Sequence, residues 1–473
     1  MEKLMDSTFA KIKKTLIGDR AFYAAVLAII IPVIIQNGIS NFVNLLDNLM
    51  VGALGDAQMS GVSIANQLIF VFNLAIWGGL AGPDIFGAQF YGAKDIENLR
   101  NTFRIKLLEA LFLLALAFTA FMGFSKPLIS LFLKGDGDPA LAENMLRNGM
   151  DYLRVILVGL PAFALTQCYA GTLRSMGETR VPMFAGVAAV LTNVVFNYLL
   201  IFGKLGLPRL EVIGAAVATV ISRYVELAIV LVFTHRNHMR FTFIEGAFRT
   251  LRVPGVLLKK VLRLSAPLLA NEVLWSVGMS TLTAIYSLCG LVVVSAMSIS
   301  VTISNLFNSV YMSMGTAVSV IVGQALGAGD FKKAKSDVWK LAAFSVCLAT
   351  AMGILLILFA PLIPRAYTGV SQEVRDLATT LLIVVACCFP LFGFGHCAYF
   401  TLRSGGKTFI TFLFDSGYTW AVSVPIALLL VKVIGADIVT TYAVVEAANL
   451  LKCIVGFIFV KSGKWVQNLT NIV

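Results

Sequence analysis

The chain has 473 residues, of which 58% are hydrophobic and only 13% charged. Water-soluble domains are nearer half apolar and a quarter charged, so this composition excludes a soluble enzyme of this length and also a disordered chain. The net charge of +12 would suggest nucleic-acid binding in a soluble protein. In a membrane protein it is typical of basic cytoplasmic loops, and we expect no nucleic-acid partner.

Long apolar segments follow one another along the whole chain. A membrane span needs about 20 apolar residues, and twelve segments qualify: 22–52, 59–85, 105–133, 152–173, 181–203, 213–234, 261–287, 291–322, 338–366, 376–402, 409–431 and 438–460. The first lacks a clear cleavage site, so we expect a retained helix. The sequence therefore predicts an all-α polytopic membrane protein with twelve transmembrane helices.

Lysine and arginine are distributed unevenly between the connections. They concentrate at the two ends of the chain and in the connections after even-numbered spans, and the other connections carry few. Cytoplasmic loops are the basic ones in membrane proteins. We therefore expect a multi-pass protein of the cell (inner or plasma) membrane with both termini in the cytoplasm and the lipid bilayer as its surroundings.

The two halves of the chain resemble each other. GTLRSMGETR at 171–180 recurs as FTLRSGGKTF at 400–409, and QFYGAKD at 89–95 recurs as QALGAGD at 324–330. Intramembrane prolines pair in the same order, Pro32 with Pro267 and Pro161 with Pro390. Because each half has an even number of spans, we expect two pseudo-symmetric six-helix lobes related by an axis near the membrane normal. The predicted division is 1–240, a cytoplasmic linker at 241–260, and 261–473.

Polar side chains form a stripe on the first span. Gln36, Ser40, Asn44 and Asp47 recur at helical spacing. Such a stripe faces the protein interior or water, either as a binding site or as hydrogen-bonding contact between helices, and Asp47 could also lie at a wet helix end. By residue count, Asn193, Asn197 and Thr219 lie at the same depth as Asp47.

These four groups supply hard oxygen ligands, which suit Na⁺, and the carboxylate could equally carry a proton. We expect no cofactor, and no metal other than possible Na⁺ at Asp47. The seven cysteines and three histidines show no zinc spacing. We expect this site to bind Na⁺ or H⁺ as a coupling ion, which is an ion whose binding drives another process of the protein.

The second half carries its own buried charges. Glu272 lies near mid-depth, five residues after Pro267 and close to Trp275, which favours recognition of an organic cation; a hydrogen bond to a neighbouring helix is the alternative. Gln36 and Asn44 are further substrate-binding candidates, and Pro32 and Pro267 are candidate hinges. Glu446 and Lys452 lie in the last span without the spacing of a helical pair.

The chain resembles the multidrug and toxic compound extrusion (MATE) family over both of its halves. The resemblance rests on NLLDNLMVGALGD around Asp47, NVVFNYLLIFG, GAAVATVISR, the two TLRS motifs, QALGAGD and SGKW at 462–465. It implies a monomeric secondary antiporter that exports cationic or amphipathic small molecules in exchange for Na⁺ or H⁺. It assigns ion-site roles to Asp47, Asn193, Asn197 and Thr219, and it places Glu272 at a glutamate known in one branch. That branch has an aspartate where this chain has Phe392.

Two other functional classes occur among polytopic membrane proteins of this kind. A lipid-linked oligosaccharide flippase of the wider superfamily is the alternative, but few Lys or Arg residues fall within the spans to bind pyrophosphate. A membrane-embedded enzyme would need paired carboxylates, a Ser/Lys dyad or a histidine cluster at depth, and none stands out. We therefore expect a transporter and not an enzyme.

Overall fold

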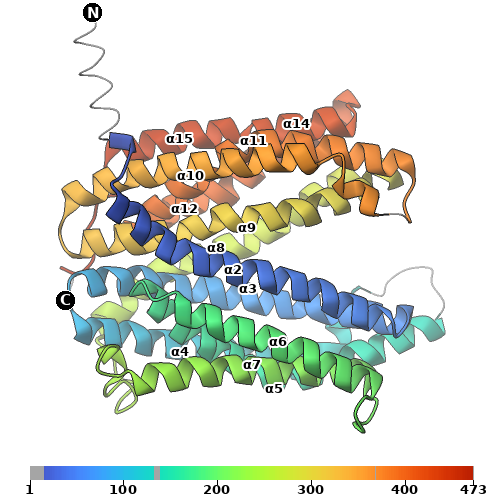
Figure 1. Cartoon of the computed structure of the whole chain (residues 1–473), viewed down its shortest axis with the longest axis horizontal. Coiled ribbons are helices and arrows are strands. Elements are labelled where there is room, and N and C mark those ends of the chain that lie inside the picture. The colour runs from blue at the N-terminus through green and yellow to red at the C-terminus, as the bar shows by residue number, and fades with distance from the viewer. Residues whose placement is uncertain (1–14, 133–138, 368, 472–473) are drawn as a thin grey trace, which may run out of the picture. The chain divides into compact units, whose positions relative to one another are not determined.

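The computed structural model describes residues 15–132, 139–367 and 369–471. Over these residues the secondary structure is helical, without strands, and twelve helical segments are long and apolar enough to cross a membrane (Figure 1). This result confirms the predicted all-α, twelve-span architecture.

Each span of the first half is a single helical segment, and α4 is kinked at Phe124, whose φ of −127° and ψ of 16° are non-helical. These helices are α2 (Arg20–Gly52), α3 (Asp56–Gly92), α4 (Ile96–Ser130), α5 (Pro139–Ser175), α6 (Arg180–Phe202) and α7 (Glu211–Arg236).

The second half begins with four long helices and ends with two interrupted spans. The long helices are α8 (Gly255–Ser287), α9 (Leu291–Gly327), α10 (Phe331–Phe359) and α11 (Gln372–Ser404). The eleventh span, Thr408–Ile434, contains α12 (Thr408–Phe412), α13 (Val424–Leu428) and three π-helical turns, Leu413–Gly417, Thr419–Ser423 and Leu429–Ile434. The twelfth comprises α14 (Ile438–Ala447) and α15 (Asn449–Ser462).

Several helices extend beyond the predicted apolar segments. The third span was predicted from residue 105, yet α4 begins at Ile96, where the Asp95 carboxylate accepts a hydrogen bond from the backbone N–H of Asn98 at 3.0 Å. A capped first turn tolerates polar residues, so the helix runs past the part that a bilayer requires to be apolar. The large exposed side chains Phe112 and Leu116 of α4 are the kind of apolar surface that lipid covers.

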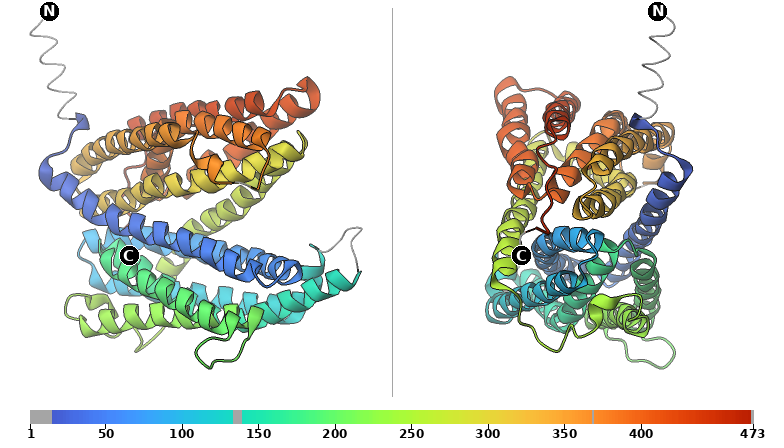
Figure 2. Two further views of the ribbon diagram at one scale, coloured as in Figure 1. Left: turned by 45° about the vertical axis from the view of Figure 1, so that its right-hand side comes forward. Right: turned by 90° about the vertical axis from the view of Figure 1, so that its left-hand side faces the viewer.

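The chain packs as two compact units. Unit 1 contains the residues up to Ile34, Ala88–Lys94 and the chain from Leu262 onward, and unit 2 contains Ile35–Gly87 and Asp95–Val261. Within unit 2, α7 packs against both α5 and α6, and within unit 1, α11 packs against both α9 and α10 (Figures 1 and 2). The predicted division of the chain around 241–260 remains a prediction.

The two candidate hinges lie inside long helices that contribute to both units. Pro32 is within α2 and Pro267 within α8. The division between units falls between Ile34 and Ile35 in α2, two residues after Pro32. A proline removes one hydrogen bond of the helix, so these are positions where bending costs less. Their role as hinges stays a prediction.

The repeated TLRS motif makes the same helix end in both halves. Thr172 and Thr401 each donate a hydrogen bond to the carbonyl four residues earlier, at 2.9 and 2.8 Å. The helices then close at Gly177 and Gly406, whose φ values of 86° and 74° lie in the left-handed region. Glycine reaches this region without steric cost, and the closing hydrogen bonds form a Schellman motif. The sequence repeat is therefore also a repeat of local structure.

Candidate functional site

The first candidate site lies in unit 2, where three helices bring four predicted side chains together. Asn197 Nδ2 of α6 donates to Asp47 Oδ1 of α2 at 2.5 Å and to Asn193 Oδ1 at 3.1 Å. Asn193 in turn contacts Thr219 Oγ1 of α7 at 3.3 Å. Counting residues along the spans predicts that these four residues lie at the same depth in the membrane. In the structure their side chains contact one another.

Small residues allow the helices to approach closely at this site. Gly214 of α7 lies against the backbone of α6, because a Cβ at this position would come within 2.7 Å of the Leu200 carbonyl oxygen. Asn193 and Asn197 are consequently buried, with 5% and 1% of their surfaces exposed. Small residues at helix contacts commonly permit interhelical hydrogen bonds of this kind in membranes.

The amide of Asn193 can serve the cluster in either of its two orientations. In the reversed orientation its nitrogen donates to Asp47 Oδ1 and Oδ2 at 2.8 and 3.0 Å, and its oxygen accepts from Thr219 Oγ1 at 3.3 Å. In either orientation the Asn193 amide links Thr219 to the pair formed by Asp47 and Asn197.

Two features of the cluster fit a small cation. Among the described residues Asp47 has no ion-pair partner, and the groups that hydrogen-bond with its carboxylate are neutral. Asn197 Oδ1 is buried and accepts no hydrogen bond from the described part of the chain. A carboxylate beside an unused amide oxygen and a hydroxyl is a donor set that suits Na⁺, and the carboxylate alone suits a proton.

Sequence reasoning missed two residues next to this cluster. Tyr152 of α5, 6% exposed, lies close to Thr219 and to Asn66 of α3. Tyr152 begins a predicted span and Asn66 is a single amide on another, so neither belongs to a polar stripe. Only the packing of α3, α5 and α7 reveals that they extend the cluster.

The structure describes the side chain of only one of the two amide residues predicted to bind substrate. Gln36 of α2 packs on α6, where its Nε2 lies 2.8 Å from the position that a Cβ of Gly186 would occupy. The side chain of Asn44 lies outside the described residues. Gln36 is thus near the Asp47 helix face but in contact with α6, and substrate binding by either residue remains a prediction.

A second polar cluster, in unit 1, includes Glu272 and a residue that the sequence analysis did not single out. Glu272 of α8 lies within electrostatic range of Arg403 and Asp415. Asp415 forms an ion pair with Lys452, with 2.7 Å between Oδ1 and Nζ. The structure therefore gives Lys452 the partner that its spacing along the chain did not reveal.

Two other positions that the sequence analysis named in the second half, Phe392 and Glu446, are not part of this ion pair. Phe392 packs with the rings of Tyr311 and Phe389, in place of the aspartate of the related branch. Glu446 accepts a hydrogen bond from Asn449 Nδ2 at 3.3 Å and lies near Tyr286.

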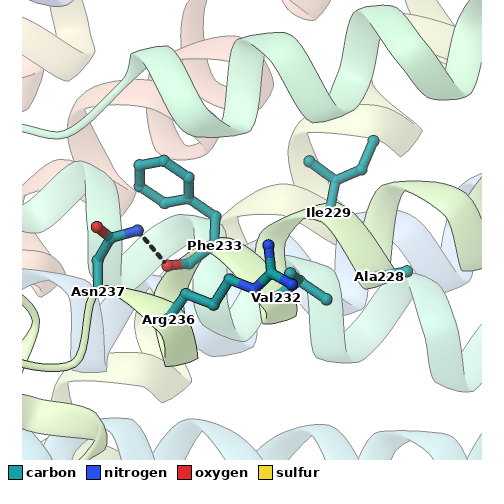
Figure 3. A pocket seen from close by; sticks show the side chains of 6 residues that line it. All are labelled: Ala228, Ile229, Val232, Phe233, Arg236 and Asn237. Carbon is teal, nitrogen blue, oxygen red and sulfur yellow. Dashed lines mark hydrogen bonds between the residues drawn. The ribbon is translucent and has the colours of Figure 1, made fainter.

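A surface groove of about 560 Å³ lies beside the last two turns of α7. It is lined by Ala228, Ile229, Val232, Phe233, Arg236 and Asn237 (Figure 3). The Asn237 amide donates to the carbonyl of Phe233 at 2.8 Å, which closes the helix end. None of the predicted site residues lines this groove.

The described residues form twelve helices that are long and apolar enough to cross a membrane, with polar clusters between them, which defines a polytopic membrane protein. The MatE family model matches residues 32–199 and 267–429. The chain belongs to the MATE family and is a transporter of small molecules, not an enzyme.

Two curated relatives agree with this assignment, and two solved structures have the same fold. "Probable multidrug resistance protein NorM" of Thermotoga maritima is 24% identical over 437 residues, covering 92% of this chain and 91% of the relative. "Probable multidrug resistance protein YoeA" of Bacillus subtilis is 25% identical, covering 85% of each chain. A MOP superfamily transporter from Pyrococcus furiosus has the same fold, with a TM-score of 0.81, 21% identity, and coverage of 93% of this chain and 95% of that one. An outward-facing MATE transporter, also 21% identical with the same coverage, gives a TM-score of 0.83.

Proposed function

We propose that the protein is a secondary active antiporter that exports cationic or amphipathic drugs or metabolites in exchange for Na⁺ or H⁺. The single observation that carries this proposal is the half-buried Asp47 carboxylate, which has no basic partner among the described residues and contacts Asn197, whose own side-chain oxygen is unused. The names of the two curated relatives support export of drug-like compounds in preference to flipping of a lipid-linked sugar.

The proposed coupling ion binds among Asp47, Asn193, Asn197 and Thr219. The cluster carries one negative charge, so one Na⁺ or one proton neutralises it. Neutralisation removes the cost of holding an unpaired charge between helices. An ion that binds one conformation more tightly than the other shifts the equilibrium between them.

α2 provides the proposed route from ion binding to conformational change. Asp47 is in the part of α2 that belongs to unit 2, and Pro32 lies in the part that belongs to unit 1. A change in the contacts of Asp47 therefore acts on α2, which bends more easily at Pro32. Pro32 lies two residues before the division between the units. We propose that Pro32 and Pro267 serve as hinges during transport.

The proposed substrate sites are Glu272 in unit 1 and Gln36 and Asn44 on α2. The carboxylate of Glu272 would attract an organic cation, and the nearby Trp275 offers an aromatic face. We further propose that the protein works as a monomer in the cell membrane with both termini in the cytoplasm, in agreement with its basic connections.

Substrate-release assays in proteoliposomes test the proposed function. The Na⁺ gradient and the pH gradient are imposed separately, with the membrane potential clamped. Release of an organic cation that depends on either gradient supports antiport and identifies the ion. Release that depends on neither gradient contradicts it.

We expect Asn193→Ala to weaken Na⁺ binding about tenfold, or to change the pH dependence of transport if the proton is the ion. The change removes one oxygen ligand and a hydrogen-bonding partner of Thr219, a loss of about 1–2 kcal/mol. Binding of radioactive sodium to the purified protein measures the first effect. Asn237→Ala, at an exposed amide directly after α7, is the control. Unchanged sodium binding together with pH-independent transport would exclude both forms of the site.

We expect Glu272→Gln to reduce export of lipophilic cations more than export of neutral compounds. The substitution keeps the shape of the side chain and removes the charge that would attract a cation. Transport rates for a matched series of cationic and neutral dyes measure the effect, with the exposed Glu373→Gln as control. An unchanged preference between the two kinds of dye would rule out the recognition role.

A further inference from the structure

Asp415 has both oxygens of its carboxylate engaged inside unit 1. Lys452 Nζ of α15 lies 2.7 Å from Oδ1, and Asn271 Nδ2 of α8 donates to Oδ2 at 3.2 Å. The side chains of Asp415 and Lys452 are only 21% and 18% exposed. Asp415 also lies in the π-helical turn Leu413–Gly417, and such turns inside helices occur frequently at functional sites.

The neighbours of Asn271 fix the direction of its amide. The backbone N–H and the hydroxyl of Ser416 donate to Asn271 Oδ1 at 3.2 and 2.7 Å. With its oxygen engaged, Asn271 presents its nitrogen to Asp415 and, at 3.4 Å, to the hydroxyl of Tyr399. Asn271 itself is only 2% exposed. The carboxylate therefore sits in a preorganised polar setting.

The same setting surrounds the Lys452 ammonium on its other sides. Lys452 Nζ lies 5.2 Å from the centre of the Phe414 ring and 5.9 Å from that of Tyr418. A carboxylate with two aromatic faces attracts a cation by charge and by cation–π interaction. Here that cation is the Lys452 ammonium, which belongs to the protein chain itself.

The clusters of Asp415 and Asp47 share one arrangement, a carboxylate beside an asparagine amide, and differ in the cation. In each, the carboxylate accepts a hydrogen bond from an asparagine amide of a neighbouring helix. Asp415 has the Lys452 ammonium, whereas Asp47 has no ion-pair partner among the described residues. One carboxylate is thus neutralised within the chain, and the other needs a cation from solution.

We propose that Lys452 is the built-in cation of a closed site at Asp415, and that a neutral side chain in its place opens this site to a monovalent cation, Na⁺ or H⁺. In the natural chain the Asp415 cluster then takes no coupling ion. This inference rests on the proposed function, because it states which of the two carboxylate clusters binds the coupling ion and which does not.

Other titratable groups face Asp415 from the helices packed around it. They are Glu272 on α8, and His396 and Tyr399 on α11; Arg403 of α11 lies near Glu272 and Tyr399. All of them stay in place in the variants below, so a difference between variants reports on Asp415 and Lys452.

The test uses the full chain carrying Asp47→Asn, so that the first cluster contributes no response to cations. Its melting temperature is compared with and without Lys452→Met, in NaCl against choline chloride and over a pH series. We expect Lys452→Met to lower the melting temperature, because it leaves a buried carboxylate unpaired. Na⁺ or acid should restore part of the loss, because a ligand that binds the native state stabilises it. The salt arm detects Na⁺ and the pH arm detects the proton.

Three further variants complete the test. Lys452→Arg keeps the positive charge and should show no gain of response to either cation. Adding Asp415→Asn to Lys452→Met removes both charges, and should restore the melting temperature and abolish the response. Lys452→Gln, whose amide can still donate to Asp415, replaces Lys452→Met if that variant does not fold.

The inference is overturned if neither neutral variant gains a response to Na⁺ or acid, or if the response persists after Asp415→Asn. Failure of the proposed function gives a different result. In that case the natural chain would release substrate independently of both gradients, and the comparison between Lys452 variants would remain interpretable.

Discussion

Replacing Asp47 by asparagine is expected to abolish gradient-driven export while leaving the protein folded in the membrane. Asparagine keeps the size and one oxygen of the aspartate, so the packing of α2 against α6 is preserved. The variant loses the one negative charge of the cluster, and with it the attraction for Na⁺ and the ability to take up a proton. Transport should therefore fall to the background of empty liposomes.

Reconstituted protein and counter-gradients of Na⁺ and H⁺ measure this effect. Expression level, elution volume and melting temperature report whether the variant is folded. Asp376→Asn is a matched control, because this carboxylate is exposed at the start of α11 and hydrogen-bonds with Gln372. Transport at the natural rate by a folded Asp47→Asn protein would exclude Asp47 as the coupling residue.

Trp465→Ala is expected to lower the stability of the protein by about 3–5 kcal/mol, the usual loss for a large buried aromatic side chain. Trp465 follows α15 and is 1% exposed in an apolar cluster of unit 1 that includes Leu402. Its indole N–H donates to the carbonyl of Val460 at 2.9 Å. The substitution removes both the packing and this hydrogen bond.

The chain beyond Trp465 should loosen in the same variant. The backbone N–H of Leu469 donates to Gln89 Oε1 at 2.7 Å, and Gln89 Nε2 donates to the carbonyl of Ser404 at 2.9 Å. Hydrogen exchange of Leu469 should therefore accelerate together with the fall in melting temperature. Trp420→Ala is the control, since Trp420 is 38% exposed. Equal losses of stability in the two variants would contradict the special role of Trp465.

The number and order of the helices could be predicted because the thickness of a bilayer fixes how long an apolar segment must be. The ends of the helices could not, since that constraint stops at the membrane surface. At α4 the cap at Asp95 and the polar residues that follow it continue the helix. At the eleventh span, apolar composition predicts a single helix and gives no sign of the π-helical turns around Asp415.

The cluster around Asp47 could be located from the sequence because its members stand at helical spacing or at a countable depth. Asn193 and Asn197 are one turn apart on one helix, which a sequence displays directly. Asp415 and Lys452 lie on different helices, and each looks like an isolated charge among apolar residues. Their contact depends on how α15 packs beside the eleventh span, which periodicity within one helix does not encode.

The two units share helices, and this has a consequence for any attempt to divide the protein. Val26 and Ile30 of α2 are part of an apolar cluster of unit 1 that otherwise includes Val318 and Leu341. A single cut in the connection between α7 and α8 would leave these residues on one fragment and most of their packing partners on the other. Functional complementation by two separately expressed halves would therefore require the N-terminal fragment to supply a helix segment to the core of its partner.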